Sequence, residues 1–198
     1  MILEFFAENK DVFIRILEDI SDVSKYASAG IVIALIYGAV YLLYTLICKL
    51  MKRERKLGMD HAVAVFMLLI YMTAFVYIVL MSREADTYSG VNMELWSSWG
   101  HSVTTKAFFI ENILLFIPMG ILMPSAFKVF RKPFVCIPVC MLVSLCIETI
   151  QYSFGLGIAE LDDVITNTAG GAIGYIIWLI LLFIHWICNK FDKSVKIG

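Results

Sequence analysis

Two pairs of polar side chains lie at helical spacing on either side of a short glycine-containing turn. Glu148 and Gln151 are three residues apart in "CIETIQYS", and Asp163 and Asn167 are four apart in "LDDVITNT". Each pair therefore shares one face of a helix. The flanking residues are apolar, and a carboxylate below a membrane surface normally faces protein, water or a partner. Such a group can act as a general acid or base, hold a metal ion, or pair with a cationic ligand.

The elements that must position these residues are long apolar helices. Hydrophobic residues make up 61% of the 198-residue chain and charged residues 17%, which leaves too little polar surface for a soluble globule. The apolar runs are continuous, whereas barrel strands alternate in shorter segments. The sequence therefore predicts an all-α fold, a polytopic membrane helix bundle of about five transmembrane helices. The expected spans are residues 27–48, 61–81, 107–127, 134–152 and 164–188.

An N-terminal amphipathic helix is expected ahead of the first span. Apolar residues such as Phe13 and Ile16 recur with a helical period opposite acidic residues such as Glu18. This pattern is typical of a helix lying at the membrane surface, and the alternative is a cap packed on the spans. The expected organisation is an interfacial helix over residues 1–25, two transmembrane helices and an extracytoplasmic loop over 26–104, and a transmembrane core over 105–190.

Lysine and arginine residues gather on one side of the predicted membrane. Eleven of the sixteen fall in residues 49–56, residues 128–132 and the tail from Lys190. Because cytoplasmic loops carry an excess of these cations, all three stretches are expected to be cytoplasmic. The sequence thus predicts a multi-pass protein of the cell membrane with an extracytoplasmic N-terminus and a cytoplasmic C-terminus.

This orientation brings polar residues from three spans to one depth on the extracytoplasmic side. Glu111 and Asn112 open one span, and the acidic pair Asp162 and Asp163 opens the last. Glu148 and Asp163 are the candidates for a catalytic role. The predicted ligand-binding residues are Glu111, Asn112, Glu148, Gln151, Asp162, Asp163 and Asn167.

A second group of residues is expected to shape the helices around this site. Pro118 removes a backbone hydrogen bond, so the span that contains it should be kinked or locally opened there. Small residues let another helix approach closely, which predicts packing along the last span. The predicted structural residues are Pro118, Gly120, Gly170, Gly171 and Gly174.

Each polar residue also has a structural explanation that competes with a role in binding. Asp162 and Asp163 precede a helix, where carboxylates cap free N–H groups and meet the favourable end of the helix dipole. Asn167 and Gln151 can join neighbouring helices by hydrogen bonds, and Glu111 can reach the membrane surface. Glu148 is the hardest to explain in this way, because it lies more than one turn from the predicted end of its span.

Three ordered segments of this sequence resemble the VanZ-like family. "ENILLFIPMGILMP", "ETIQ" and "LDDVITNTAGGAIGY" carry the resemblance, which covers roughly residues 105–180. It implies a small multi-helix membrane protein of a family named for low-level resistance to teicoplanin, a lipid-tailed glycopeptide. It implies no particular reaction. The family's motif positions fall here on Asn112, Pro118, Gly120, Glu148, Gln151, Asp163, Asn167 and Gly171.

One position departs from the family pattern. Many members have an arginine a few residues ahead of the acidic pair, where this sequence has Gly157 and Ile158. An acidic site without that cation needs another counter-charge. The sequence offers Arg83 or Lys106 from the outer loop, and a metal ion or an amine of the ligand are the alternatives.

Three classes of function remain open at this point. The favoured one is a non-enzymatic membrane factor that binds or excludes amphiphilic molecules at the outer leaflet. The first alternative is an intramembrane enzyme acting on a lipid or lipid-linked cell-wall precursor through Glu148 and Asp163, although a nucleophile and base pair is not evident. The second is a transporter, which ranks last because no inverted repeat is evident.

The partners follow from the same pattern. Membrane lipids are expected around the spans, and a lipid-tailed glycopeptide or a cell-wall precursor is expected at the polar site. The chain lacks the spacings of a zinc protease, a phosphate loop or a dinucleotide fingerprint. No metal, cofactor or nucleic-acid partner is therefore predicted.

Overall fold

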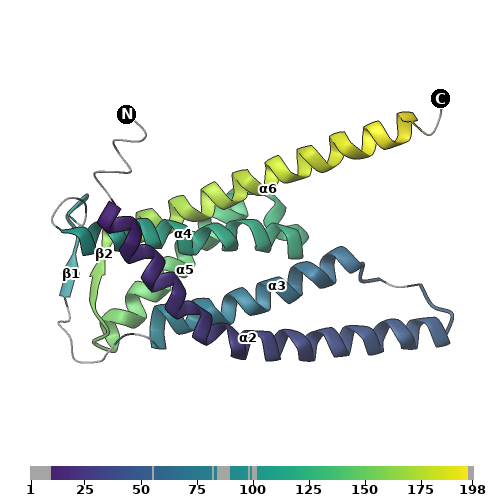
Figure 1. Cartoon of the computed structure of the whole chain (residues 1–198), viewed down its shortest axis with the longest axis horizontal. Coiled ribbons are helices and arrows are strands. Elements are labelled where there is room, and N and C mark those ends of the chain that lie inside the picture. Colours follow the sequence, from purple (N-terminus) through teal and green to yellow (C-terminus); the bar gives the residue numbers. More distant parts are fainter. Residues whose placement is uncertain are drawn as a thin grey trace.

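The fold is a bundle of long helices with one small strand pair at an end (Figure 1). The computed structural model describes residues 10–54, 56–81, 83, 90–97, 99 and 102–195, with side chains left undescribed at 18–27 and 191–195. In chain order the elements are α2 (Lys10–Leu50), α3 (Met59–Val76), the π-helical turn η1 (Tyr77–Met81), β1 (Gly90–Asn92), α4 (Val103–Ala126), the 3-10 turn η2 (Lys128–Arg131), α5 (Pro133–Ser153), β2 (Ile158–Glu160) and α6 (Leu161–Val195).

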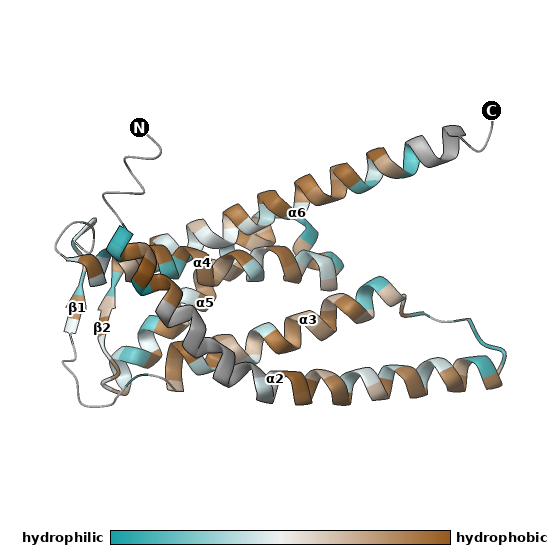
Figure 2. Cartoon of the chain, in the orientation of Figure 1, coloured by the Kyte–Doolittle hydropathy of each residue, from teal (hydrophilic) through white to brown (hydrophobic). Residues whose placement is uncertain are grey.

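The fold class predicted from the sequence is confirmed. Within the described residues, five helices are long and apolar enough to cross a membrane. Figure 2 shows apolar residues along the lengths of these helices and hydrophilic residues mainly near their ends and in the connections. The protein is therefore a multi-pass membrane protein. The spans are Ser28–Leu50, Met59–Met81, Val103–Ala126, Pro133–Ser153 and Leu161–Lys190.

The two ends of the bundle differ in charge. One end contains β1, β2 and the first turn of α6, and we call it the acidic end because Glu160, Asp162 and Asp163 lie there. The other contains residues 49–54, 56 and 128–132, and we call it the basic end. In Figure 1 the strands mark the acidic end, and the α2–α3 connection marks the basic end.

The N-terminal segment continues without a break into the first span. α2 begins at Lys10 and runs to Leu50, whereas residues 1–9 of the expected interfacial helix lie outside the described part of the chain. Val12 and Ile16 form a buried cluster with Ala107 of α4. These two turns of α2 therefore pack on the bundle. This agrees with the alternative expectation, a cap packed on the spans. Their depth relative to a membrane stays a prediction.

Glycines bring α4 and α6 into close contact over the length of the bundle. A Cβ atom added at Gly170 would overlap the carbonyl oxygen of Ile113, and one at Gly174 would overlap that of Ile117. A Cβ atom at Gly120 would overlap the carbonyl oxygen of Gly171. Backbone can approach backbone this closely only where at least one of the two facing residues lacks a side chain. The two helices run side by side from the acidic end (Figure 1).

The third structural glycine of α6, Gly171, directs its Cβ position toward a different helix, although its carbonyl oxygen faces Gly120 of α4. A Cβ atom at Gly171 would lie 2.7 Å from Sγ of Cys140 in α5. Cys140 belongs to the main buried cluster, which also contains Phe75 of α3 and Phe116 of α4. The main core therefore lies where α3, α4, α5 and α6 meet.

Side chains from other helices donate hydrogen bonds to backbone carbonyls of α4 and of the basic end. α4 continues through Pro118 as one helix, and the Tyr71 hydroxyl donates to the Leu115 carbonyl at 2.8 Å in the turn before it. At the end of α4, a ring nitrogen of His61 lies 2.7 Å from the Ala126 carbonyl oxygen. The Tyr175 hydroxyl donates to the Arg131 carbonyl at 2.6 Å. At Ala126 and Arg131, side chains from other helices thus satisfy carbonyls that a helix end leaves open.

Candidate functional site

The candidate site lies where α5 ends and α6 begins, at the acidic end. Seven residues, 154–160, join Ser153 of α5 to Leu161 of α6, and β2 occupies the last three of them. The chain turns at Gly155 and Gly157, whose φ angles are +65° and +153°. Residues with a Cβ rarely adopt these angles, so glycine is required at the turn. α5 and α6 are consequently neighbours, as the short connection predicts.

Glu148 is a buried carboxylate with a backbone partner. Its side chain is 6% exposed, and Oε2 accepts a hydrogen bond of 3.0 Å from the backbone N–H of Glu160. The partner belongs to β2, which pairs in parallel with β1 through Ala159 and Val91. β1 lies in the connection between η1 and α4, which we call the outer connection after the orientation that the sequence predicts. Glu148 therefore fixes the strand pair to the end of α5.

Asp163 and Arg83 supply the other charges near Glu148. Asp163 is half-buried in the first turn of α6 and is repelled by the charges of Glu148 and Glu160. Arg83 interacts favourably with both Glu148 and Asp163. A Cβ atom on Gly157 would lie 3.0 Å from Nη1 of Arg83, so the guanidinium lies against the turn. Arg83 thus brings a cation to the turn at Gly157. This is the point at which the family pattern has an arginine in the sequence.

The two amide residues of the predicted site bond to separate partners. Nε2 of Gln151 donates to the Val79 carbonyl at 3.0 Å, and Nδ2 of Asn167 donates to Oγ of Ser144 at 2.9 Å. Gln151 is 1% exposed and Asn167 4%. Among the described residues, the side-chain oxygens of both amides are buried and have no hydrogen-bond partner. Buried acceptors of this kind are rare in folded proteins, so these two oxygens mark an unusual point of the bundle.

No hydrogen bond in the described part of the chain joins any two of Glu148, Gln151, Asp163 and Asn167. The two carboxylates interact through space, whereas each amide secures a different contact. That all four act as one unit stays a prediction.

Asp162 points to the outer connection. Its Oδ1 accepts a hydrogen bond of 2.7 Å from the backbone N–H of Trp96, a residue with a φ angle of +64°. The Trp96 ring lies 6.0 Å from that of Phe109 in α4, centroid to centroid. Asp162 therefore holds the segment that crosses this end of the bundle. The sequence offers no direct signal for this contact, because the partner is a backbone group 66 residues away.

Glu111 and Asn112 lie on α4 at a similar depth. Both are half-buried, and Ile113 immediately after them contacts Gly170 of α6. This register puts them level with the turn of α6 that follows Asn167. The expectation that polar residues of three spans share one depth fits this arrangement, and a role for Glu111 and Asn112 in binding stays a prediction.

An apolar groove, which we call the lateral groove, lies beside this site. It has a volume of about 290 Å³ and runs between residues 72–80 of α3 and η1 and residues 139–150 of α5. All its lining residues are apolar or cysteine, and Val79, Ile147 and Ile150 line its acidic end. Sequence reasoning missed this groove, because it depends on how two separate spans pack.

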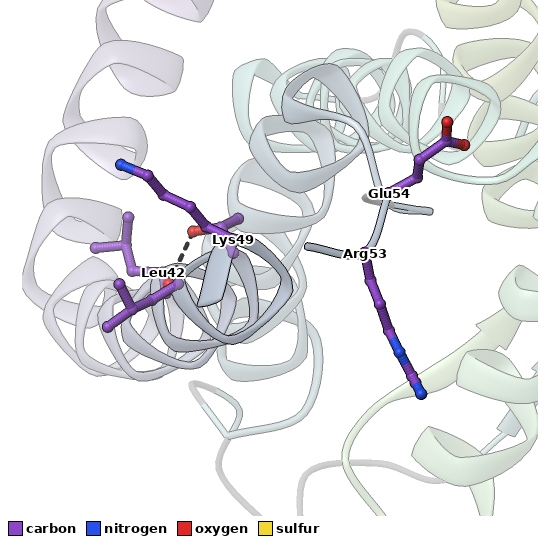
Figure 3. Close-up of a pocket in the computed structure, with 6 residues that line it drawn as sticks. Leu42, Lys49, Arg53 and Glu54 are labelled. Carbon is purple, nitrogen blue, oxygen red and sulfur yellow. Dashed lines mark hydrogen bonds between the residues drawn. The ribbon is translucent and has the colours of Figure 1, made fainter. Parts of the chain in front are cut away.

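A larger open pocket lies at the basic end, against the end of α2 (Figure 3). It has a volume of about 600 Å³ and includes Lys49, Arg53 and Glu54 in its lining. In Figure 3 these three side chains point in different directions. A binding site needs polar groups that converge on the ligand, and these three do not. We therefore place the candidate site at the acidic end.

The fold and this site define a class of protein: a multi-pass membrane protein whose described residues form five membrane-length helices, with a buried carboxylate, Glu148, and a half-buried one, Asp163, at one end of the bundle. A family model described as VanZ/LLP1 matches residues 34–183, which includes most of the first span, Ser28–Leu50, and all of α3 as well as the motif region. The chain therefore belongs to the VanZ/LLP1 family.

Comparison with curated proteins agrees with this assignment. The chain is 32% identical over 136 residues to "Protein VanZ" of Enterococcus faecium, and the match covers 66% of this chain and 78% of that protein. No solved structure matches the chain. The resemblance drawn from three sequence motifs is thus confirmed.

Proposed function

We propose that this protein is a non-enzymatic membrane factor that binds or excludes amphiphilic molecules at the outer leaflet. Through this activity it contributes to low-level resistance to lipid-tailed glycopeptides such as teicoplanin. Its site is the acidic end of the bundle, which faces the outside of the cell in the orientation that the cation pattern favours. The partners are membrane lipids and a lipid-tailed glycopeptide or cell-wall precursor.

The observation that carries this proposal is the placement of Glu148. A carboxylate this deeply buried in a membrane bundle is costly and is normally retained for a function. Glu148 lies near a second carboxylate, Asp163, and near the cation Arg83. The lateral groove begins on the adjacent face of α5, at Ile147. Charged groups next to an apolar groove match the two parts of an amphiphile.

The membership of the VanZ/LLP1 family supports the link to glycopeptides. The test is expression in a glycopeptide-sensitive Gram-positive host, with teicoplanin and vancomycin compared side by side. We expect protection against the lipid-tailed drug and little change with vancomycin. Equal protection against both drugs, or none against either, would contradict the proposal.

Matched variants connect the phenotype to the site. Glu148→Gln and Asp163→Asn each remove one charge with little change in volume, and both should abolish protection. Glu94→Gln is the control, because Glu94 is an exposed acid of the same outer connection. It should retain protection. All three variants must be present in the membrane at equal amounts, which immunoblotting of membrane fractions checks.

The carboxylate pair also supports the enzyme alternative in one respect. Two carboxylates that differ in burial, Glu148 at 6% exposed and Asp163 half-buried, are the kind of pair that divides acid and base roles. Lipid extracts from cells with and without the protein distinguish the two classes. A lipid species that is gained or lost when the protein is present would favour catalysis, provided that the Glu148→Gln variant causes no such change.

A further inference from the structure

The connection between α4 and α5 carries three cations within five residues, 128–132, which we call the basic turn. Lys128, Arg131 and Lys132 are all exposed. Within the described part of the chain, none of the three forms an ion pair with a carboxylate. Like charges this close to one another repel, so an anion from outside the chain would be stabilised here.

The basic turn is held in a fixed shape by the bundle. Phe130 packs against the main buried cluster. Nε of Arg131 donates to the Pro124 carbonyl at 3.2 Å, and the Arg131 carbonyl accepts from the Tyr175 hydroxyl at 2.6 Å. The two terminal nitrogen atoms of the guanidinium form no hydrogen bond with the described residues. This fork can therefore bind two oxygens of one phosphate, and a preformed turn loses little freedom on binding.

The depth of the basic turn follows from the register of α4 against α6. Gly174 of α6 contacts Ile117, and α4 ends nine residues later at Ala126, so the end of α4 is level with about residue 183. α6 continues past the ends of α4 and α5 (Figure 1). Phe183 and Trp186 at this level are 60% and 58% exposed. Because such side chains of a membrane span contact lipid, the basic turn lies at the membrane surface rather than out in water.

Apolar side chains flank the cations of the basic turn. Phe134, two residues after Lys132, is 90% exposed, more than any other large apolar side chain of the described residues. Val129, between Lys128 and Phe130, is 56% exposed. At a membrane surface, exposed apolar side chains enter the lipid while neighbouring cations meet the phosphate groups. This combination matches the two parts of a phospholipid.

We propose that the basic turn binds an anionic phospholipid of the leaflet at the basic end. Arg131 and the two lysines bind the phosphate of its headgroup, and Phe134 contacts its acyl chains. This site lies at the opposite end of the bundle from the acidic end, so it is independent of the proposed function. It assigns a lipid class to a surface that the drug-facing site does not use.

The test uses the full-length chain in detergent micelles and native mass spectrometry, which counts the lipid molecules bound to each protein. The probes are phosphatidylglycerol and phosphatidylcholine with the same acyl chains. The phosphate of phosphatidylcholine carries its own cation, choline, and gains less from the basic turn. We expect phosphatidylglycerol to bind about tenfold more tightly, which corresponds to the contribution of one or two basic side chains at a membrane surface.

Two double variants locate the preference. Lys128→Gln with Lys132→Gln removes two charges from the basic turn, and neither side chain forms a hydrogen bond with the described residues. The preference for phosphatidylglycerol should fall to about twofold or less. Lys49→Gln with Arg53→Gln is the matched control, because it removes two charges from the same end outside the basic turn. This control should keep the preference.

Each contrary result overturns the proposal. Equal affinity of the unchanged chain for the two lipids would do so even if a variant failed to fold. Equal losses in the two double variants would assign the preference to the net charge of the whole end. Displacement of phosphatidylglycerol by an equal concentration of glycerol phosphate, the headgroup without chains, would assign the basic turn to a soluble anion. A dimer that is lost with Lys128→Gln and Lys132→Gln would assign it to a second copy of the chain.

Discussion

At the scale of single residues, Glu148 has a structural and a functional task at once. Its Oε2 accepts from the backbone of β2, and its charge contributes to the carboxylate group of the acidic end. Asp162 differs, because its carboxylate holds the Trp96 backbone and thereby the outer connection. Asp162 and its neighbour Asp163 therefore have to be tested with different measurements. Stability is the measurement for Asp162, and ligand binding is the measurement for Asp163.

The structural task of Glu148 leads to a prediction about stability. Glu148→Ala removes the acceptor for the Glu160 N–H, and leaving such a group unpaired costs about 1–3 kcal/mol. Glu148→Gln retains an acceptor oxygen at the same position. Thermal unfolding in detergent should therefore show a clear loss for Glu148→Ala and a smaller one for Glu148→Gln. Equal losses would mean that the hydrogen bond to β2 adds little to stability.

At the scale of elements, the spans were predictable and their partners were not. Length and hydropathy locate all five helices, because an apolar run must be long enough to cross a membrane. The small residues of α6 indicate close packing, yet Gly170 and Gly174 face α4 while Gly171 faces α5. α6 lies between two helices, and the pattern on one helix does not say which neighbour meets each face.

The candidate site was predictable to the same extent. Glu148, Gln151, Asp163 and Asn167 are identified by polarity within apolar runs. Their partners come from distant segments: Val79 from η1, Ser144 from the middle of α5 and the guanidinium of Arg83. A backbone carbonyl or a single serine has no special signal in a sequence, so these contacts required the structure.

Helix packing provides a second prediction, with a control on the same protein. Gly174→Ala adds a Cβ that would overlap the Ile117 carbonyl oxygen, so α4 and α6 must move apart. Overpacking of this kind costs about 1–3 kcal/mol. Gly38→Ala is the matched change, because its Cβ would lie 3.7 Å from Phe66, an ordinary contact. We expect a lower unfolding temperature in detergent for Gly174→Ala only.

For Gly38→Ala the expected result is an unchanged or slightly higher unfolding temperature, since alanine is the better residue within a helix. If both variants unfold at the temperature of the unchanged chain, α4 and α6 do not approach as closely as the glycines indicate. The two variants together therefore separate a general effect of substitution from an effect of the helix contact.

At the scale of the whole molecule, the two ends of the bundle have different chemistry. The acidic end holds the carboxylates, the strand pair and the outer end of the lateral groove. The basic end holds residues 49–54, 56 and 128–132, together with the contacts of His61 and Tyr175. If cations mark the cytoplasmic side, the acidic end meets molecules that arrive from outside the cell.

This orientation is the prediction on which the drug-facing function depends. Met93→Cys places a thiol on an exposed residue of the outer connection, 66% exposed, and Arg53→Cys places one at the basic end. In intact cells a membrane-impermeant thiol reagent should label Met93→Cys above the level of the unchanged chain. Arg53→Cys should label only after the membrane is permeabilised. The reverse pattern would place Glu148 and Asp163 on the cytoplasmic side, and a glycopeptide acting outside the cell would then have no access to the site.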